Sequence, residues 1–91
     1  MHRLEWKKRA RLDLLEIVGY IAQDNPENAE KLADEIESKI ESLQEHPKLC
    51  RAGRKRGTRE FVAHPNYLVV YRIQGETVEI LRVKHTAQQW P

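Results

Sequence analysis

Residues 67–83, YLVVYRIQGETVEILRV, decide the fold of this 91-residue chain. The segments 67–73 and 77–83 are rich in β-branched and aromatic side chains, the types that strands favour. Gly75 lies between them in a Gln-Gly-Glu turn, where a short hairpin connection needs a permissive residue. The stretch therefore predicts two antiparallel strands joined by a tight turn.

Strand character also occurs on both sides of this hairpin. Upstream, residues 59–63 predict another strand, and the turn that follows makes it antiparallel to the next one. At the start of the chain, residues 2–6 alternate polar and apolar side chains, with Leu4 and Trp6 on one face. That alternation predicts a short first strand.

The intervening residues have the period of a helix. Residues 8–23 repeat apolar side chains at helical spacing and predict an amphipathic helix. Asn25 suits an N-cap, and Pro26 suits the first position of a second helix. We expect this helix to end near His46, because Pro47 disfavours helical geometry in the residue before it. The short connection makes the pair an antiparallel helical hairpin.

In order, the elements form a β-α-α-β-β-β chain of the α+β class. The helical hairpin must cover one face of an antiparallel sheet in order to bury its apolar stripe. The length, with 40% hydrophobic and 33% charged residues, suits a single soluble globular domain spanning residues 1–91. No apolar run approaches the roughly 20 residues that span a bilayer, and the first residues lack the apolar core of a secretory signal.

Cysteine and histidine usage excludes several kinds of site. Cys50 is the only cysteine, so an intramolecular disulfide and a metal site built from several thiolates are both excluded. The four histidines have no spacing typical of metal ligands. We therefore expect a cytoplasmic protein without a metal or other cofactor.

The net charge of +2 conceals a marked segregation of charge along the chain. Residues 1–11 carry five bases and one acid, residues 12–47 two bases and ten acids, and residues 48–91 nine bases and three acids. Such asymmetry indicates a basic surface for a polyanion or an acidic partner. The alternative is that these charges only solvate the helices and strands.

The densest basic stretch is the polar segment 47–58, which we interpret as a loop. Gly53 and Gly57 allow close backbone approach there. Exposed guanidinium groups bind phosphate or carboxylate through paired hydrogen bonds, so RNA, DNA and an acidic protein all stay open as partners, as does a merely solvated loop. The candidate target- and anion-binding residues are Arg51, Arg54, Lys55, Arg56 and Arg59, together with Lys84.

The end of the last strand offers a candidate for acid–base chemistry. His85 is expected just past the strand, close to two bases, and a neutral imidazole there could act as a general base on a ribose 2′-hydroxyl. A structural or merely exposed histidine is the alternative. Tyr67 and Tyr71 share one strand face, where packing is favoured over base stacking. Trp90 is expected to pack onto the helices rather than to form an exposed contact site.

Several stretches resemble the RelE/ParE superfamily of toxins from type II toxin–antitoxin modules. They are residues 53–60 (GRKRGTRE), 67–72 (YLVVYR) and 78–85 (VEILRVKH), and the resemblance extends to residues 6–26 and to the terminal QQWP. Together they cover essentially the whole chain. The resemblance implies two helices packed on an antiparallel sheet, in agreement with the pattern of the residues.

The resemblance implies one of two activities. RelE-like members are ribosome-dependent mRNA endonucleases, whereas ParE-like members poison DNA gyrase and cleave no RNA. The nucleases use an arginine where this chain has Leu68, and often an arginine or tyrosine past the last strand, where Thr86 follows His85. His85 does match a histidine that some nucleases use. The missing arginine favours the ParE-like branch, since losing a preorganised charge typically costs about 2.7–4 kcal/mol of transition-state stabilisation.

The ParE-like resemblance implies a plasmid-stabilisation toxin that arrests growth by inhibiting DNA gyrase. A cognate antitoxin would neutralise it by laying an acidic, partly disordered segment over the basic surface. Operator DNA would be contacted only through the antitoxin, and no membrane contact is expected.

Two other hypotheses stay open. One is a ribosome-dependent endonuclease, or mRNA interferase, with His85 as the base. In that endonuclease, the negative charge on the phosphate of the RNA would be stabilised by Arg59, Arg72 or Arg82. The other is a module that only binds an antitoxin and operator DNA.

Overall fold

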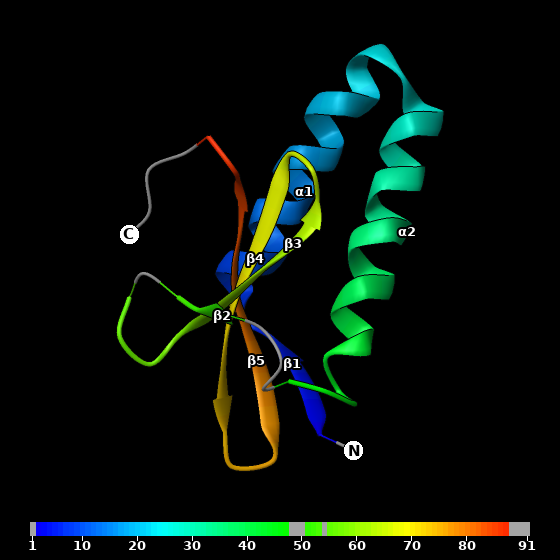
Figure 1. Cartoon of the computed structure of the whole chain (residues 1–91). Helices are drawn as coiled ribbons and strands as arrows, with labels where there is room; N and C mark the ends of the chain where they lie inside the picture. Colours follow the sequence, from blue (N-terminus) through cyan, green and yellow to red (C-terminus); the bar gives the residue numbers. More distant parts are fainter. Residues whose placement is uncertain (1, 48–50, 54, 88–91) are drawn as a thin grey trace.

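The computed structural model describes residues 2–47, 51–53 and 55–87 of the chain (Figure 1). These residues form two helices and five strands: β1 (Arg3–Trp6), α1 (Lys8–Asp24), α2 (Pro26–Ser42), β2 (Arg51–Ala52), β3 (Arg59–His64), β4 (Tyr67–Gln74) and β5 (Thr77–His85). The predicted α+β class and the β-α-α-β-β-β order are confirmed, with the two-residue β2 as an addition.

The strands form one sheet in the order β1-β5-β4-β3-β2. β3, β4 and β5 are joined by consecutive hairpins and run antiparallel, as predicted. β1, however, pairs parallel to β5, with Arg3 opposite Thr77. The sheet is therefore mixed, and the prediction of a wholly antiparallel sheet is wrong at this edge. The cause is the helical hairpin, which returns the chain to the start of β1, where His2 N donates to Gln44 O (3.1 Å). β3 and β5 consequently run in the direction of β1.

Local sequence signals set the limits of the helices. Asn25 Oδ1 accepts a hydrogen bond from Asn28 N (3.1 Å), which is the predicted N-cap, and α2 begins at the next residue, a proline. α2 ends at Ser42, earlier than the predicted end near His46. Amides of residues 43–45 bond to carbonyls three positions earlier and tighten the end of the helix into turns.

α1 and α2 cover one face of the sheet (Figure 1). Between these layers lies a core formed by Ala10, Leu14, Leu32, Ile36, Ile40, Leu43, Ala63, Val69, Tyr71, Val78, Ile80 and Val83. Tyr71 is completely buried, and its hydroxyl donates to the carbonyl of Pro47 (2.5 Å). This ring therefore packs in the core, as expected, rather than offering a face to a base. No helix in the described ranges is long and apolar enough to cross a membrane.

Strand alternation divides the side chains of the sheet between two faces. Val69 and Tyr71 of β4 belong to the core beneath the helices, so Leu68 and Arg72 lie on the opposite side, here called the far face. Residues directly opposite on neighbouring strands share a face. Glu79, opposite Arg72 on β5, therefore also lies on the far face.

A β-bulge in β5 brings Arg82 to the far face. Val70 pairs with Arg82, whereas Tyr71 pairs with Ile80, so Leu81 is an extra residue in β5. Such a bulge bends the strand and re-aims its side chains. As a result, Leu81 and Arg82 line the same cavity.

Candidate functional site

The basic segment predicted as a loop is in large part a β-hairpin. β2 pairs antiparallel with β3, and beyond this pairing Gly53 N donates to Thr58 O (2.7 Å). Thr58 N in turn donates to Lys55 O (3.1 Å), and Gly57 has φ +82°. These values match a type II turn, which needs positive φ at its third position. The prediction of a loop over residues 47–58 is therefore wrong at β2, whereas residues 48–50 and 54 of that segment lie outside the described residues.

Close contact between the two arms fixes the tip of this hairpin. A Cβ at Gly53 would lie 2.1 Å from Thr58 Oγ1, a hydroxyl that donates to the carbonyl of Lys55 (2.5 Å). Only glycine leaves room for that arrangement. The tip exposes Lys55 and Arg56, two of the predicted anion-binding residues.

A cavity of about 480 Å³, here called the basic pocket, lies between the hairpin tip and the far face of the sheet. It is lined by Lys55, Arg56, Gly57, Thr58, Arg72, Leu81 and Arg82. The pocket brings together two predicted anion-binding residues from the tip and two of the predicted nuclease residues from β4 and β5. Arg54 lies outside the described residues, and only the backbone of Arg51 is described.

On the far face, Arg72 is bound to Glu79. Arg72 Nε donates to Glu79 Oε1, and Lys7 Nζ lies 3.1 Å from Glu79 Oε2. The hydrogen bond from Arg72, followed by that from Lys7, lowers the pKa of Glu79 despite its burial. Lys7 Nζ also lies 3.2 Å from Glu5 Oε1. Hydrogen bonds to Glu79 and then Glu5 raise the pKa of Lys7.

Arg82 is bound to Asp13 of α1. Nε and Nη2 of Arg82 lie 2.7 and 3.0 Å from the two carboxylate oxygens, and this bidentate pair raises the pKa of Arg82. Asp13 also accepts from Val83 N (3.0 Å), and Arg9 Nε lies 3.4 Å from its Oδ1. β1 pairs only with residues 77–80 of β5. The aspartate therefore supplies an acceptor for a β5 amide beyond the reach of β1.

Our reading of the sequence assigned no role to Asp13 or Glu79. For Asp13 a signal existed, because it follows Ala10 by three positions and precedes Leu14 on the apolar stripe of α1. An acid at such a position is buried, and Asp13 is only 6% exposed. Buried carboxylates almost always have a cationic or hydrogen-bonding partner. The spacing of the residues in the sequence did not indicate that Arg82 would be the partner of Asp13.

The other two nuclease candidates lie on the helix-covered face. His85 is the last residue of β5, not a residue beyond it as predicted, and its ring centroid lies 5.3 Å from that of Tyr67. Arg59 is opposite Tyr71, whose ring is in the core. Strand position therefore places two of the four predicted nuclease residues on each face, although the side chain of Arg82 reaches Asp13 of α1.

His85 is also held in one tautomer. Its Nδ1 accepts a hydrogen bond from Ala87 N (3.0 Å). The neutral ring consequently carries its proton on Nε2, where it donates rather than accepts. Lys84 and His85 line a second cavity, of about 410 Å³, which Arg82, Tyr20 and Tyr67 also line. No group of three or more potential metal ligands occurs within the part of the chain that the structure describes.

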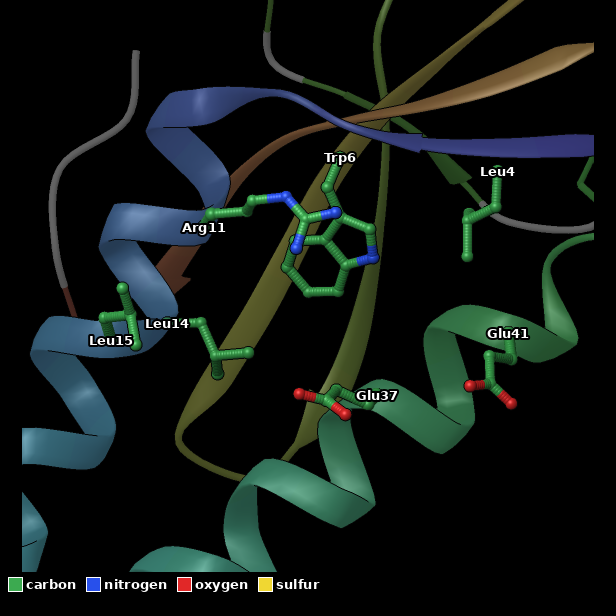
Figure 2. A pocket seen from close by; sticks show the side chains of 7 residues that line it. All are labelled: Leu4, Trp6, Arg11, Leu14, Leu15, Glu37 and Glu41. Carbon is green, nitrogen blue, oxygen red and sulfur yellow. The ribbon is translucent and has the colours of Figure 1, made fainter.

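An apolar groove of about 310 Å³ lies between β1, α1 and α2, and the sequence patterns did not predict it (Figure 2). Its lining residues are Leu4, Trp6, Leu14 and Leu15, with Arg11 on α1 and with Glu37 and Glu41 on α2. The guanidinium carbon of Arg11 lies 5.8 Å from the centroid of the Trp6 ring, a cation–π contact. Leu15 is 68% exposed. Exposed apolar patches rimmed by charge are typical of protein contact sites.

Two helices packed on a mixed sheet form the RelE/ParE-like α+β fold. A solved structure of the chromosomal ParDE toxin–antitoxin system from P. aeruginosa matches the fold with a TM-score of 0.84. That match covers 93% of this chain and 96% of the other, at 24% sequence identity.

The sequence identifies the family. Residues 4–90 match the model of the ParE toxin of the type II toxin–antitoxin system parDE. Y4kP of Sinorhizobium fredii, which is designated a toxin, is 42% identical over 90 residues, covering 98% of this chain and 93% of Y4kP. Toxin RelE2 of Caulobacter vibrioides is 33% identical over 88 residues, covering 97% and 99%. The chain belongs to the ParE toxin family of type II toxin–antitoxin systems, in which its partner is a cognate antitoxin.

Proposed function

We propose that this toxin arrests growth by binding DNA gyrase through the basic pocket, without cleaving RNA. The observation that carries the proposal is that the four nuclease candidates are spread over three cavities and do not line a single one. A ribonuclease needs its acid–base and charge-stabilising groups around one scissile phosphate. Arg82 lines one cavity with His85 and another with Arg72, whereas Arg59 lines a third, so the four residues do not surround a common point.

Position 68 supports the same proposal. The resemblance implies an arginine here in the nucleases, whereas this chain has Leu68, which is 3% exposed. A buried aliphatic side chain cannot stabilise the negative charge that develops on a phosphate during cleavage. Stabilisation of the phosphate charge during RNA cleavage would need another cation at the place that Leu68 occupies.

The hydrogen bond that Ala87 N donates to His85 Nδ1 weighs against a role of His85 as general base. Such a base must present a lone pair to the hydroxyl that it deprotonates. In His85 the Nδ1 lone pair is used by Ala87 N, and Nε2 carries the proton of the neutral ring. In this state the residue serves as a structural link at the end of β5.

The basic pocket supplies the charge for a target contact. Lys55 and Arg56 are exposed on a hairpin tip that hydrogen bonds and Gly53 hold in one shape. Fixed cations of this kind steer and orient a partner of opposite charge. Because the tip is exposed, its contribution should weaken as salt rises.

For the antitoxin we propose two contacts. An acidic segment covers the basic pocket and blocks the target contact. An apolar segment occupies the groove beside Trp6 and Leu15, with its basic side chains towards Glu37 and Glu41 and an acid towards Arg11. Both contacts follow from the charge and polarity of the surfaces.

Expression of the toxin without its antitoxin tests the target. We expect filamentous cells with a DNA-damage response, and inhibition of gyrase supercoiling by the purified toxin. Rapid loss of protein synthesis with messages cut on ribosomes would support a ribosome-dependent endonuclease instead. Absence of any growth phenotype would support a module that only binds antitoxin and operator DNA. The variant His85→Ala should stay fully toxic if gyrase is the target and should lose toxicity if RNA cleavage is the activity.

A further inference from the structure

We infer that Glu79 and Asp13 are positioning residues that hold Arg72 and Arg82 as fixed walls of a phosphate-binding basic pocket. The inference deepens the proposed function, since it rests on the basic pocket as the target contact. It gives the two carboxylates a role beyond stability. Neither of them lines the pocket; each binds an arginine that does.

Each carboxylate is shared by two cations, and exposed cations at the hairpin tip add to the positive charge of the pocket. Glu79 contacts both Arg72 and Lys7 (3.1 Å). Asp13 contacts Arg82 at 2.7 Å and Arg9 at 3.4 Å. Asp13, Arg82 and Arg9 together carry one net positive charge, whereas Lys7 also contacts Glu5 (3.2 Å), so the charges of Glu79, Glu5, Arg72 and Lys7 sum to zero. With exposed Lys55 and Arg56 at the tip, the surroundings of the pocket stay strongly basic.

The carboxylates restrict the arginines that they bind. A free arginine loses much rotamer freedom when a ligand immobilises it, and that loss weakens binding. Arg82 is held by two hydrogen bonds, of 2.7 and 3.0 Å, and its side chain is only 21% exposed. Arg72 is held through Nε while its side chain stays 45% exposed. Both guanidinium groups keep further N–H donors on nitrogens outside these bonds.

The pocket favours phosphate over carboxylate. A planar carboxylate is satisfied by a single guanidinium fork, as the bidentate contact of Asp13 with Arg82 in this chain shows. In the pocket, cations come from three elements: the hairpin tip, β4 and β5. Donors converging from several directions suit a tetrahedral oxyanion with three or four acceptor oxygens.

The test measures binding of pyrophosphate by titration calorimetry to the wild type, Glu79→Gln and Asp13→Asn. Glu5→Gln is the matched control for the first, because Glu5 lies opposite Glu79 on β1 and also contacts Lys7, but is not bound to a pocket arginine in any described contact. Glu16→Gln is the control on α1. Circular dichroism verifies that each variant is folded, and NMR signals of the arginine Nε–H groups report whether Arg72 and Arg82 are held.

We expect both positioning variants to bind pyrophosphate roughly 2- to 12-fold more weakly, the range that corresponds to freeing one side chain. Their arginine Nε–H signals should lose protection from exchange. The controls should bind equally or slightly more tightly. The sign is decisive, because each substitution removes a negative charge. Unchanged or tighter binding by Glu79→Gln and Asp13→Asn would mean that only total charge matters, and would overturn the inference.

Two further ligands identify the source of the phosphate. A 12-nucleotide DNA strand that binds more tightly than pyrophosphate would identify a nucleic-acid backbone, and the reverse order would identify a free phosphate compound. Tighter binding of a hexaglutamate peptide than of either would overturn phosphate in favour of carboxylate. If the wild type inhibits gyrase but binds no pyrophosphate, only this inference fails. If it binds pyrophosphate as described but does not inhibit gyrase, only the proposed function fails.

Discussion

Asp13 on α1 accepts two hydrogen bonds from the guanidinium of Arg82 on β5, 69 positions later in the chain. The same carboxylate accepts a third from Val83 N. One side chain therefore joins α1 to both a side chain and the backbone of β5. The contact lies beyond the residues that β1 pairs, so it secures the half of β5 that leads to the basic pocket.

Replacing Asp13 by Ala should lower the free energy of unfolding by about 2–4 kcal/mol. The substitution leaves a largely buried guanidinium and a strand amide without their acceptor. Urea denaturation monitored by circular dichroism measures the loss. Glu16→Ala, at an exposed acid three positions later, should change stability by less than about 0.5 kcal/mol. Equal stability of Asp13→Ala and the wild type would show that the link contributes nothing.

Two glycine-to-alanine substitutions should change stability in opposite directions. At Gly53 the new methyl group would meet Thr58 Oγ1 at 2.1 Å, so Gly53→Ala should destabilise by about 1–3 kcal/mol. At Gly19, within α1, a Cβ meets nothing within 4 Å, so Gly19→Ala should stabilise by about 0.5–1 kcal/mol. Thermal and urea unfolding of both variants measures the pair. A stabilising Gly53→Ala would contradict the close approach of Gly53 to Thr58.

Stability should fall at acid pH in part because of Glu79. Its pKa is lowered in the folded protein from the usual value of 4.5, chiefly by Arg72. The stabilisation is therefore fully present above pH 4.5 and is lost as pH falls through the lower pKa of the folded state. Unfolding free energies of the wild type and Glu79→Gln, measured between pH 3 and 7, should converge as the pH decreases. A difference independent of pH would rule out Glu79 as the titrating group.

The elements of the fold were predictable because each rests on local chemistry. The β-branched and aromatic segments on either side of Gly75 predicted the β4–β5 hairpin, and Asn25 followed by Pro26 predicted the start of α2. The parallel pairing of β1 with β5 was not predictable in this way. It depends on the direction in which the helical hairpin returns the chain, and no residue pattern near Arg3 encodes that direction.

The candidate site was predictable only in its composition. The basic segment pointed to Lys55 and Arg56, and both line the basic pocket. The face of the sheet on which each remaining candidate residue lies depends on the register of strand pairing. Arg59 and His85 lie on the helix-covered face, whereas the bulge at Leu81 brings Arg82 to the far face. A one-residue shift reverses the face of every following side chain, and a sequence does not reveal where such a shift occurs.

The hairpin tip should be the part of the toxin on which gyrase inhibition depends most. We expect the double variant Lys55→Ala/Arg56→Ala to inhibit gyrase supercoiling roughly tenfold more weakly than the wild type, because it removes two exposed cations from the contact. The double variant Lys8→Ala/Lys31→Ala removes the same charge from exposed positions on the helices and should inhibit normally. Both should unfold at wild-type temperatures, since exposed charges contribute little to stability. The difference between them should shrink at high salt, where exposed charges are screened. Equal inhibition by the two double variants at low salt would exclude the tip as the gyrase contact and would shift attention to the apolar groove beside Trp6.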